Sequence, residues 1–304
     1  MRIRKPGKVR EGIWFFGREE SGVYLLQGKD DFMIVSGGMS YIVPDILQQL
    51  KEFGIDQTRI KKLLILHSHF DHVGIVPFFK RRLPAIEVSA SPRAWEVLHT
   101  DKAILTINEF GRSVAQRMEK GNVYSAYDLE WRKDVSGKTV REGDRIDLGG
   151  MEVFILEIPG HSSCCIAAYV PELKALFPTD GGGIPFGQTI ISSGNSNYTK
   201  YQRSLERLKD LEVDYFCADH YGYITGLEAR EYISKSIESA KKNRAQIEEV
   251  YRSTRDVDAA AEALTSSFYE ENPGYFLSPQ IFLEVHRQMV RHLATAMEGK
   301  AESP

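Results

Sequence analysis

A cluster of histidines and one aspartate, placed directly after a buried strand, constrains this sequence more than any other feature. The run Leu63–Leu66 is wholly apolar, as expected for a strand buried on both faces of a sheet. The next six residues read His67-Ser-His69-Phe-Asp71-His72. Strand ends in α/β proteins point side chains into the crevices where ligands bind, and buried imidazoles without a partner are costly. The pattern therefore predicts a ligand site, and imidazole and carboxylate groups suit a metal ion.

The elements predicted around this cluster indicate a layered α/β fold. Short β-rich runs suggest an N-terminal meander, and they lie at 13–16, 23–26 and 32–35. Helical spacing over 44–53 and 73–82 then alternates with the buried run and with a strand at 86–89. Strand-like stretches return at 151–158, 166–170, 175–177 and 215–217. Such alternation is the signature of helices layered on sheets.

Two regions read as mostly helical, and they define the predicted domain organisation. One is an insert over about 91–122, and the other is the chain beyond Gly226, with helices near 227–252, 257–270 and 279–297. Ser278-Pro279 reads as a cap residue followed by proline at the first helical position. We predict a body over 1–225 and a C-terminal helical extension over 226–304 that caps the site.

Composition narrows the classes of partner and location. The 304 residues carry a net charge of −3, which favours neither nucleic acid nor an anionic membrane. No apolar stretch approaches the roughly 20 residues that cross a bilayer, and the N-terminus is not typical of a signal peptide. Three cysteines are too few for a disulfide framework, so we expect a reducing compartment and a cytoplasmic protein.

The cluster at 67–72 resembles the HxHxDH signature of the metallo-β-lactamase fold superfamily. Members of that family carry three further ligands downstream, in the order His, Asp, His, each after a strand. This chain supplies His161, Asp180 and His220 after three of the predicted strands. The resemblance covers about residues 11–225 and implies a four-layer αββα sandwich.

The same resemblance implies a site with two divalent metal ions. It assigns His67, His69 and His161 to the first ion, Asp71, His72 and His220 to the second, and Asp180 to both. Zinc is the favoured metal, and iron or manganese also suits these ligands. A hydroxide between the ions would attack an acyl carbonyl, with Asp71 orienting it or accepting its proton.

Other residues near the motifs are candidates for supporting roles. Tyr221 and Tyr223 follow a ligand histidine and are candidates to stabilise an oxyanion. Phe70 and Phe186 are candidates to line the substrate pocket, although Phe70 fits a plain packing role equally well. Asp219 precedes His220 in sequence, and it fits equally well as a residue that orients His220 and as an exposed surface residue.

One position departs from the family pattern. Many members carry Asp-x-Gly after the third strand, where this chain reads Val35-Ser36-Gly37-Gly38. Ser36 can hydrogen-bond but brings no charge, so we expect altered support of the metal ligands without loss of metal.

Four functions are compatible with this ligand set. Hydrolysis of a thioester or similar ester of a small acyl compound is favoured, by resemblance to the glyoxalase II and quinolone-signal response thioesterase branches. A lactonase is the alternative, and a phosphodiesterase or nuclease is a further one that the charge balance disfavours. The fourth is a regulatory interaction module with an incidental metal site, whose helical extension would serve as a partner or homodimer surface.

Overall fold

The computed structural model describes residues 1–298 and groups the chain into two compact units. The first unit comprises Met1–Glu157, Cys164–Thr179 and Glu212–Arg230. The second comprises Ile158–Ser163, Asp180–Leu211 and the chain from Glu231 onward. Because the units interleave along the chain, the predicted division near residue 225 stays a prediction, as does the capping of the site by the helical extension. Residues 299–304 of that extension lie outside the described part.

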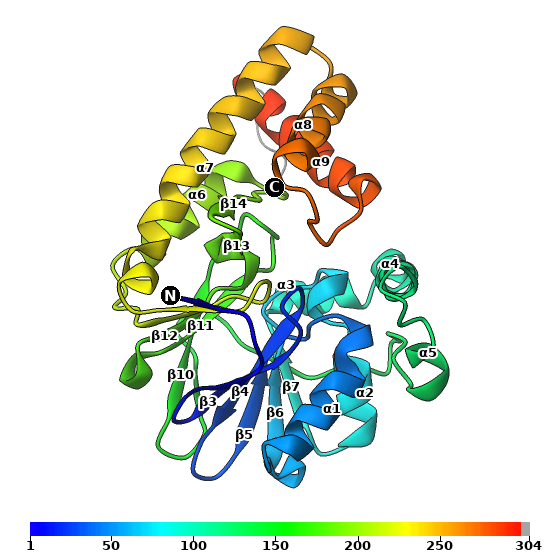
Figure 1. Cartoon of the computed structure of the whole chain (residues 1–304), viewed down its shortest axis with the longest axis vertical. Coiled ribbons are helices and arrows are strands. Elements are labelled where there is room, and N and C mark those ends of the chain that lie inside the picture. The colour runs from blue at the N-terminus through cyan, green and yellow to red at the C-terminus, as the bar shows by residue number, and fades with distance from the viewer. Residues whose placement is uncertain (299–304) are drawn as a thin grey trace. The chain divides into compact units, whose positions relative to one another are not determined.

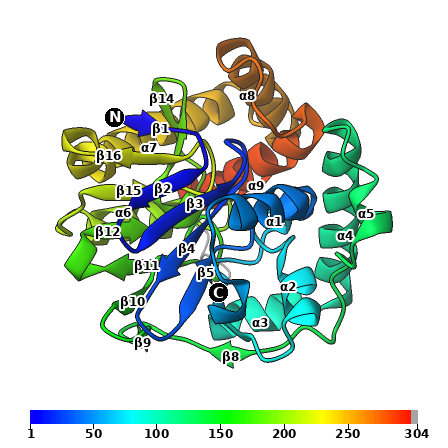
Figure 2. The same cartoon turned by 60° about the horizontal axis from the view of Figure 1, so that its bottom comes forward.

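Two seven-stranded sheets form the body of the first unit (Figure 2). One sheet has the order β2 (Gly7–Arg10), β3 (Ile13–Gly17), β4 (Gly22–Gln27), β5 (Phe32–Val35), β6 (Ile60–Leu64), β7 (Glu87–Ala90) and β8 (Lys138–Thr139). The other has the order β1 (Arg2–Ile3), β16 (Tyr223–Thr225), β15 (Tyr215–Cys217), β12 (Ala175–Phe177), β11 (Ile166–Val170), β10 (Glu152–Glu157) and β9 (Arg145–Asp147). The predicted meander is confirmed as the antiparallel strands β3 to β5, and β5 to β8 pair in parallel.

Five helices belong to the first unit (Figure 1). They are α1 (Val43–Glu52), α2 (Val76–Arg82), α3 (Pro92–Leu98), α4 (Asp101–Arg117) and α5 (Val123–Ala126). The hydroxyl of Ser91 accepts a hydrogen bond from Ala94 N at the start of α3, and Thr100 does the same for Ala103 N at the start of α4. Helices α3 and α4 lie within the segment 91–122 where a helical insert is predicted, and α5 begins just after it.

Alternation along the strands builds the hydrophobic core between the two sheets. Ile13 and Phe15 of β3 lie in this core together with apolar residues of β10, β11 and β12. Trp14 and Phe16 point to the opposite face, where their rings lie 5.3 and 5.9 Å from the ring of Phe53 at the end of α1. Strand β3 therefore packs against the second sheet on one face and against α1 on the other, as a layered fold requires.

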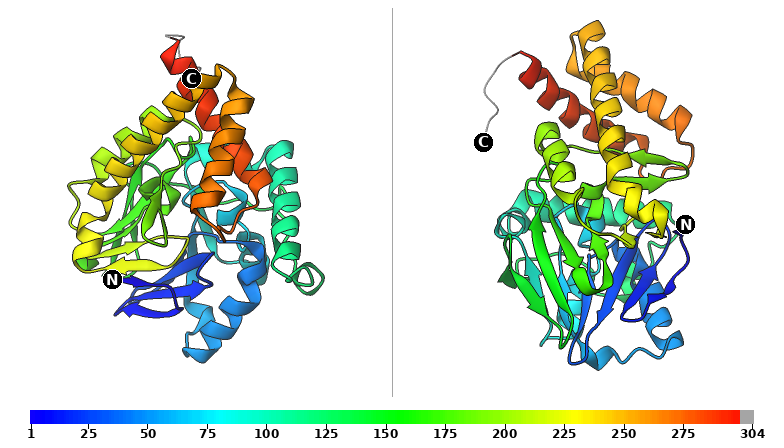
Figure 3. Two further views of the ribbon diagram at one scale, coloured as in Figure 1. Left: turned by 45° about the horizontal axis from the view of Figure 1, so that its top comes forward. Right: turned by 90° about the vertical axis from the view of Figure 1, so that its left-hand side faces the viewer.

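The second unit is mainly helical (Figures 1 and 3). It contains the hairpin β13 (Ile184–Phe186) and β14 (Thr189–Ile191), α6 (Tyr198–Leu208), most of α7 (Leu227–Thr254), α8 (Val257–Glu271) and α9 (Pro279–Met297). The predicted start of α9 is confirmed, since the Ser278 hydroxyl accepts from Ile281 N at 3.4 Å and Pro279 opens the helix. The hairpin β13–β14 was not predicted. Over residues 1–298, no helix combines the length and apolar character needed to cross a membrane.

A buried histidine joins α8 to α9. The Nδ1 atom of His286 lies 2.9 Å from the hydroxyl of Thr265, and that hydroxyl donates to the Ala261 carbonyl. The imidazole therefore donates from Nδ1. Its side chain is buried, and burial lowers the pKa of His286 to about 4.

We predict that this histidine makes the fold sensitive to acid. The unfolded chain binds the proton more tightly than the folded one, so the free energy of unfolding is highest above about pH 6.5 and falls toward pH 4. The loss at pH 4 should be about 3 kcal/mol. Urea unfolding of the wild type and His286→Leu at pH 7 and pH 4 measures this loss as the difference between their pH responses. His99→Leu, at an exposed position, is the control; the same pH response in wild type and His286→Leu would contradict the prediction.

Candidate metal centre

Loops at the ends of strands in both sheets carry the predicted ligands of the first unit. The chain leaves β6 at Leu64 and reaches a 3-10 turn, Phe70–His72, which holds Asp71 and His72. His220 lies in the loop between β15 and β16. Both histidines and Asp71 are buried, as is His67, whereas His69 is half-buried.

Three of these side chains present their ligand atoms to one another. The Nε2 atoms of His72 and His220 lie 3.1 Å apart, and Asp71 Oδ2 lies 3.7 and 3.6 Å from them. The two remaining motif histidines are adjacent, since the ring centroid of His67 lies 4.6 Å from that of His69 and 4.1 Å from that of His72. The structure thus brings together all five predicted ligands that the first unit contains.

Hydrogen bonds made by the Nδ1 atoms of His72 and His220 determine which tautomer each imidazole adopts. His72 Nδ1 donates to Asp219 Oδ2 at 2.8 Å, and His220 Nδ1 donates to the backbone carbonyl of Glu20 at 2.7 Å. A neutral imidazole that donates from Nδ1 carries a lone pair on Nε2. Two lone pairs therefore face each other beside a carboxylate, and a cation bound between them would relieve their electrostatic repulsion.

The spacing of the three atoms fits a metal ion. Tetrahedral zinc with bonds of about 2.0–2.1 Å holds two nitrogen ligands roughly 3.3 Å apart, close to the 3.1 Å between the two Nε2 atoms. Asp71, His72 and His220 form one of the groups whose ligand atoms all lie within 4.8 Å of each other. The residues present therefore suit a divalent ion.

The second unit shows the same arrangement at His161 and Asp180. His161 Nδ1 donates to the Ser193 carbonyl at 2.8 Å, which leaves Nε2 as the ligand atom, 3.5 Å from Asp180 Oδ2. Both side chains are buried. Gly160 sets the loop with φ of +137°, and a Cβ there would lie 2.1 Å from Tyr201 N, so only glycine fits before this histidine.

The two tyrosines predicted as catalytic lie in different surroundings. Tyr223 on β16 belongs to the hydrophobic core between the sheets, with its ring edge-on to Phe15 at 6.1 Å. This position favours a packing role over the predicted catalytic one. Tyr221 adopts φ of +62°, and the guanidinium of Arg4 lies 5.8 Å from its ring centroid.

The two phenylalanines predicted to bind substrate are half-buried and packed against other rings. Phe70, inside the metal motif, lies edge-on to Phe110 of α4 at 5.4 Å. Helix α4 of the insert therefore packs directly on the turn that carries Asp71 and His72. Phe186 of β13 lies edge-on to Tyr275 at 5.5 Å, within the second unit.

Sequence reasoning missed the main role of Asp219. Its carboxylate is buried and binds His72, whereas a link to His220 or an exposed position was expected. Its place two residues after a core strand and next to a ligand was the available signal. Ser36 does hydrogen-bond as expected, since its hydroxyl donates to Asp219 Oδ2 at 2.9 Å.

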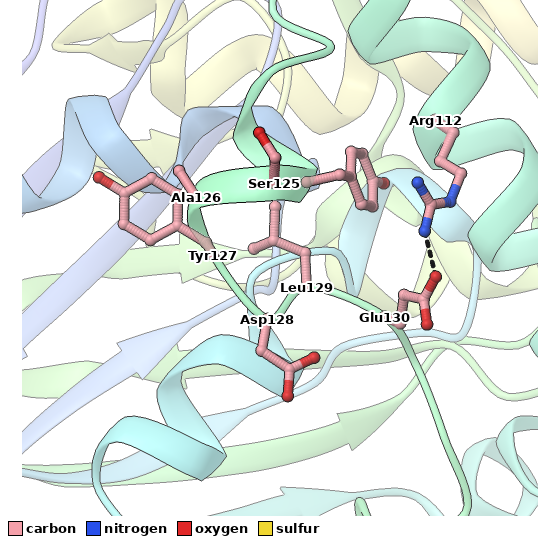
Figure 4. Close-up of a pocket in the computed structure, with 8 residues that line it drawn as sticks. Arg112, Ser125, Ala126, Tyr127, Asp128, Leu129 and Glu130 are labelled. Carbon is pink, nitrogen blue, oxygen red and sulfur yellow. Dashed lines mark hydrogen bonds and ion pairs between the residues drawn. The ribbon is translucent and has the colours of Figure 1, made fainter.

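A separate hollow of about 430 Å³ lies on the first unit and is lined by Arg112 and residues 124–130 (Figure 4). Its charged groups are already engaged. Arg112 pairs with Glu130 and lies over the ring of Tyr124, and Asp128 binds Arg81 and Arg132. The pair of Arg112 and Glu130 joins α4 to the segment that follows α5, and the pair of Arg81 and Asp128 joins α2 to the same segment, so these groups serve packing rather than metal binding.

Comparison with known proteins identifies the family. The model of the metallo-beta-lactamase superfamily matches residues 17–220. The chain belongs to this superfamily. The probable metallo-hydrolase YqjP of Bacillus subtilis is 25% identical over 257 residues, covering 76% of this chain and 74% of that protein. A hydroxyacylglutathione hydrolase of Prochlorococcus marinus is 26% identical over 170 residues, covering 53% and 52%.

A solved structure agrees with this assignment. The metallo-beta-lactamase family protein TTHA1429 from Thermus thermophilus matches with a TM-score of 0.66 and 18% identity, over 96% of this chain and 95% of that one. The predicted αββα sandwich of the superfamily, with a C-terminal helical extension formed by α7, α8 and α9, is confirmed.

We predict that removing one of the facing imidazoles weakens metal binding. His220→Ala should lower the zinc content of the purified protein by one ion per chain, because the ion that Asp71 and His72 help to hold then loses one of its nitrogen ligands. Elemental analysis after dialysis against a weak chelator measures this. His99→Ala is the matched control at an exposed position; unchanged zinc in His220→Ala would exclude this histidine as a ligand.

Proposed function

We propose that this protein is a metal-dependent hydrolase that cleaves a thioester or related ester of a small acyl compound. The observation that carries the proposal is the pair of Nε2 lone pairs, 3.1 Å apart beside Asp71, on imidazoles whose Nδ1 atoms donate to oxygen. Membership of the metallo-beta-lactamase superfamily supports it.

The proposed ligand set follows the family pattern and holds two divalent ions, zinc being favoured over iron or manganese. His67, His69 and His161 would bind the first ion, Asp71, His72 and His220 the second, and Asp180 both. The 3.5 Å between His161 Nε2 and Asp180 Oδ2 supports their joint use as ligands. Each of the seven proposed ligands lies in a loop that follows a strand, as the family pattern requires.

The chemistry divides between the ions and the chain. Divalent ions held by these residues would polarise the scissile carbonyl and lower the pKa of bound water to near neutrality. The residues of the chain orient the reactants and handle the proton. Asp71 is the proposed proton acceptor, because its carboxylate lies within 4 Å of His72 Nε2 and His220 Nε2 and so beside the proposed position of the ion and its water. The Tyr221 hydroxyl is the proposed donor to the developing oxyanion.

Two observations support an acyl thioester as substrate. The similarity to a hydroxyacylglutathione hydrolase links this sequence to a protein named for an acyl thioester, over about half of each chain. In addition, the half-buried ring of Phe70 borders the metal motif and offers an apolar surface to an acyl group. Phe186 is proposed as a second such surface. A cytoplasmic location and a homodimer stay predictions.

A hydrolysis panel tests the proposal. We expect the zinc-loaded protein to cleave acyl thioesters faster than lactones or phosphodiesters, and to lose this activity when a strong chelator removes the metal. His161→Ala should lower kcat/KM at least about 100-fold, because loss of a ligand disrupts the ion that polarises the carbonyl.

His99→Ala is the control variant and should retain the wild-type rate. Faster cleavage of lactones or of phosphodiesters would replace the thioester proposal with one of those activities. An unchanged rate in His161→Ala would remove this residue from the ligand set.

A further inference from the structure

One buried carboxylate lies behind two of the metal-ligating histidines. We propose that Asp219 is a positioning residue that holds both His67 and His72 with Nε2 as the ligand atom, and so supports the ligands of both ions at once. This inference rests on the proposed function for its assignment of His67 and His72 to different ions.

The first step concerns the Oδ2 atom of Asp219. It lies 2.8 Å from His72 Nδ1, 2.6 Å from Thr179 Oγ1 and 2.9 Å from Ser36 Oγ. An ionised carboxylate only accepts hydrogen bonds, so all three groups donate to it. The contact with His72 therefore fixes the tautomer of that imidazole.

The second step extends this control to His67. The hydroxyl of Thr179 has a single proton, which it gives to Asp219. Its oxygen lies 3.1 Å from His67 Nδ1, and it can only accept from that nitrogen. His67 consequently carries its proton on Nδ1 as well, and its Nε2 lone pair faces the metal side.

The third step is the backbone conformation of the donors. Ser36 and Thr179 both adopt left-handed conformations, with φ of +72° and +46°. Such a conformation is uncommon for residues other than glycine, and most of all for a β-branched residue such as threonine, so it costs free energy. The hydrogen bonds to Asp219 offset part of this cost, and the strained turns bring both hydroxyls to the same oxygen.

The fourth step is the charge of Asp219. Its side chain is 2% exposed, and no lysine or arginine among residues 1–298 forms an ion pair with it. Its second oxygen, Oδ1, has no hydrogen-bond partner within that range. Three hydrogen bonds to Oδ2 compensate the burial of this carboxylate only in part, because Oδ1 accepts none. The positive charge of ions on His67 and His72 would offset more of the cost. Metal and Asp219 should therefore stabilise each other.

The test measures zinc affinity and coordination without any substrate. Asp219→Asn keeps the size of the side chain and removes its charge, and zinc binding by competition with a chromophoric chelator should weaken about 10- to 100-fold at both ions. The absorption bands of the cobalt(II)-loaded variant should also shift, because the imidazoles are no longer held in one orientation. Asp210→Asn, an exposed aspartate, is the matched control and should match the wild type in both readouts.

Two further variants separate positioning from general damage to the fold. Thr179→Val keeps the shape of the side chain but removes the link to His67, so it should weaken the ion that His67 binds more than the other one. Exchanging the two groups in Ser36→Asp/Asp219→Ser should recover affinity relative to Asp219→Ser, since aspartate tolerates the left-handed conformation at position 36. Circular dichroism of the metal-free proteins checks that each variant is folded.

Failure of the positioning role and failure of the proposed function give different results in these experiments. Wild-type zinc affinity and an unshifted cobalt spectrum in folded Asp219→Asn would overturn the role of Asp219, whatever the enzyme hydrolyses. The same result in folded Thr179→Val would overturn the link to His67. Weakened zinc binding in both variants, together with a wild type that cleaves no ester, would leave the positioning role standing and refute only the proposed substrate.

Discussion

The candidate site depends on hydrogen bonds made by the Nδ1 atoms of the motif histidines. His72 donates to a carboxylate, His220 and His161 donate to backbone carbonyls, and His67 contacts a threonine hydroxyl. Each of these oxygens is held by the fold and leaves Nε2 as the ligand atom. Without them the imidazoles could turn or change tautomer, and the same residues would form an ordinary polar cluster.

The fold of the first unit delivers these oxygens from segments that are far apart in sequence. Asp219 and the Glu20 carbonyl lie in turns that hydrogen-bond to each other, since Gly22 N donates to the Asp219 carbonyl at 2.7 Å. The buried hydroxyl of Tyr24 on β4 donates to the Ala218 carbonyl at 2.7 Å and fixes the start of the loop that carries His220. Packing between the two sheets is thus connected directly to the orientation of the ligands.

Much of this architecture was predictable because local sequence patterns, such as apolar runs and cap residues, specify it. The run Leu63–Leu66, the meander and the cap at Ser278-Pro279 appear in the structure where the sequence places them. The strands β13 and β14 have three residues each, too few for a periodic pattern to mark them, and within residues 1–298 they pair with one another alone. Tyr223 illustrates a different limit. Successive side chains on a strand face opposite sides of the sheet, so the start of β16 decides whether Tyr223 faces the core or the site. The sequence does not show where this short strand begins.

Within the site, residue types were easier to predict than partners. The order His, Asp, His after three strands follows the family pattern, but the partner of Asp219 depends on how two loops, 36–40 and 218–222, approach each other in space. Only the structure shows that Asp219 binds His72 rather than its neighbour in sequence. For the same reason, the absence of a charge at Ser36 could be noticed in the sequence, while its contact with Asp219 could not.

The central claim is that His72 and His220 present Nε2 to a common metal ion. Diffraction from crystals grown with zinc, recorded on both sides of the zinc absorption edge, tests this directly. The account predicts an anomalous peak about 2.0–2.1 Å from both Nε2 atoms and within bonding distance of Asp71. Crystals in which these atoms are well ordered, zinc is present, and no peak lies between the two rings would contradict it.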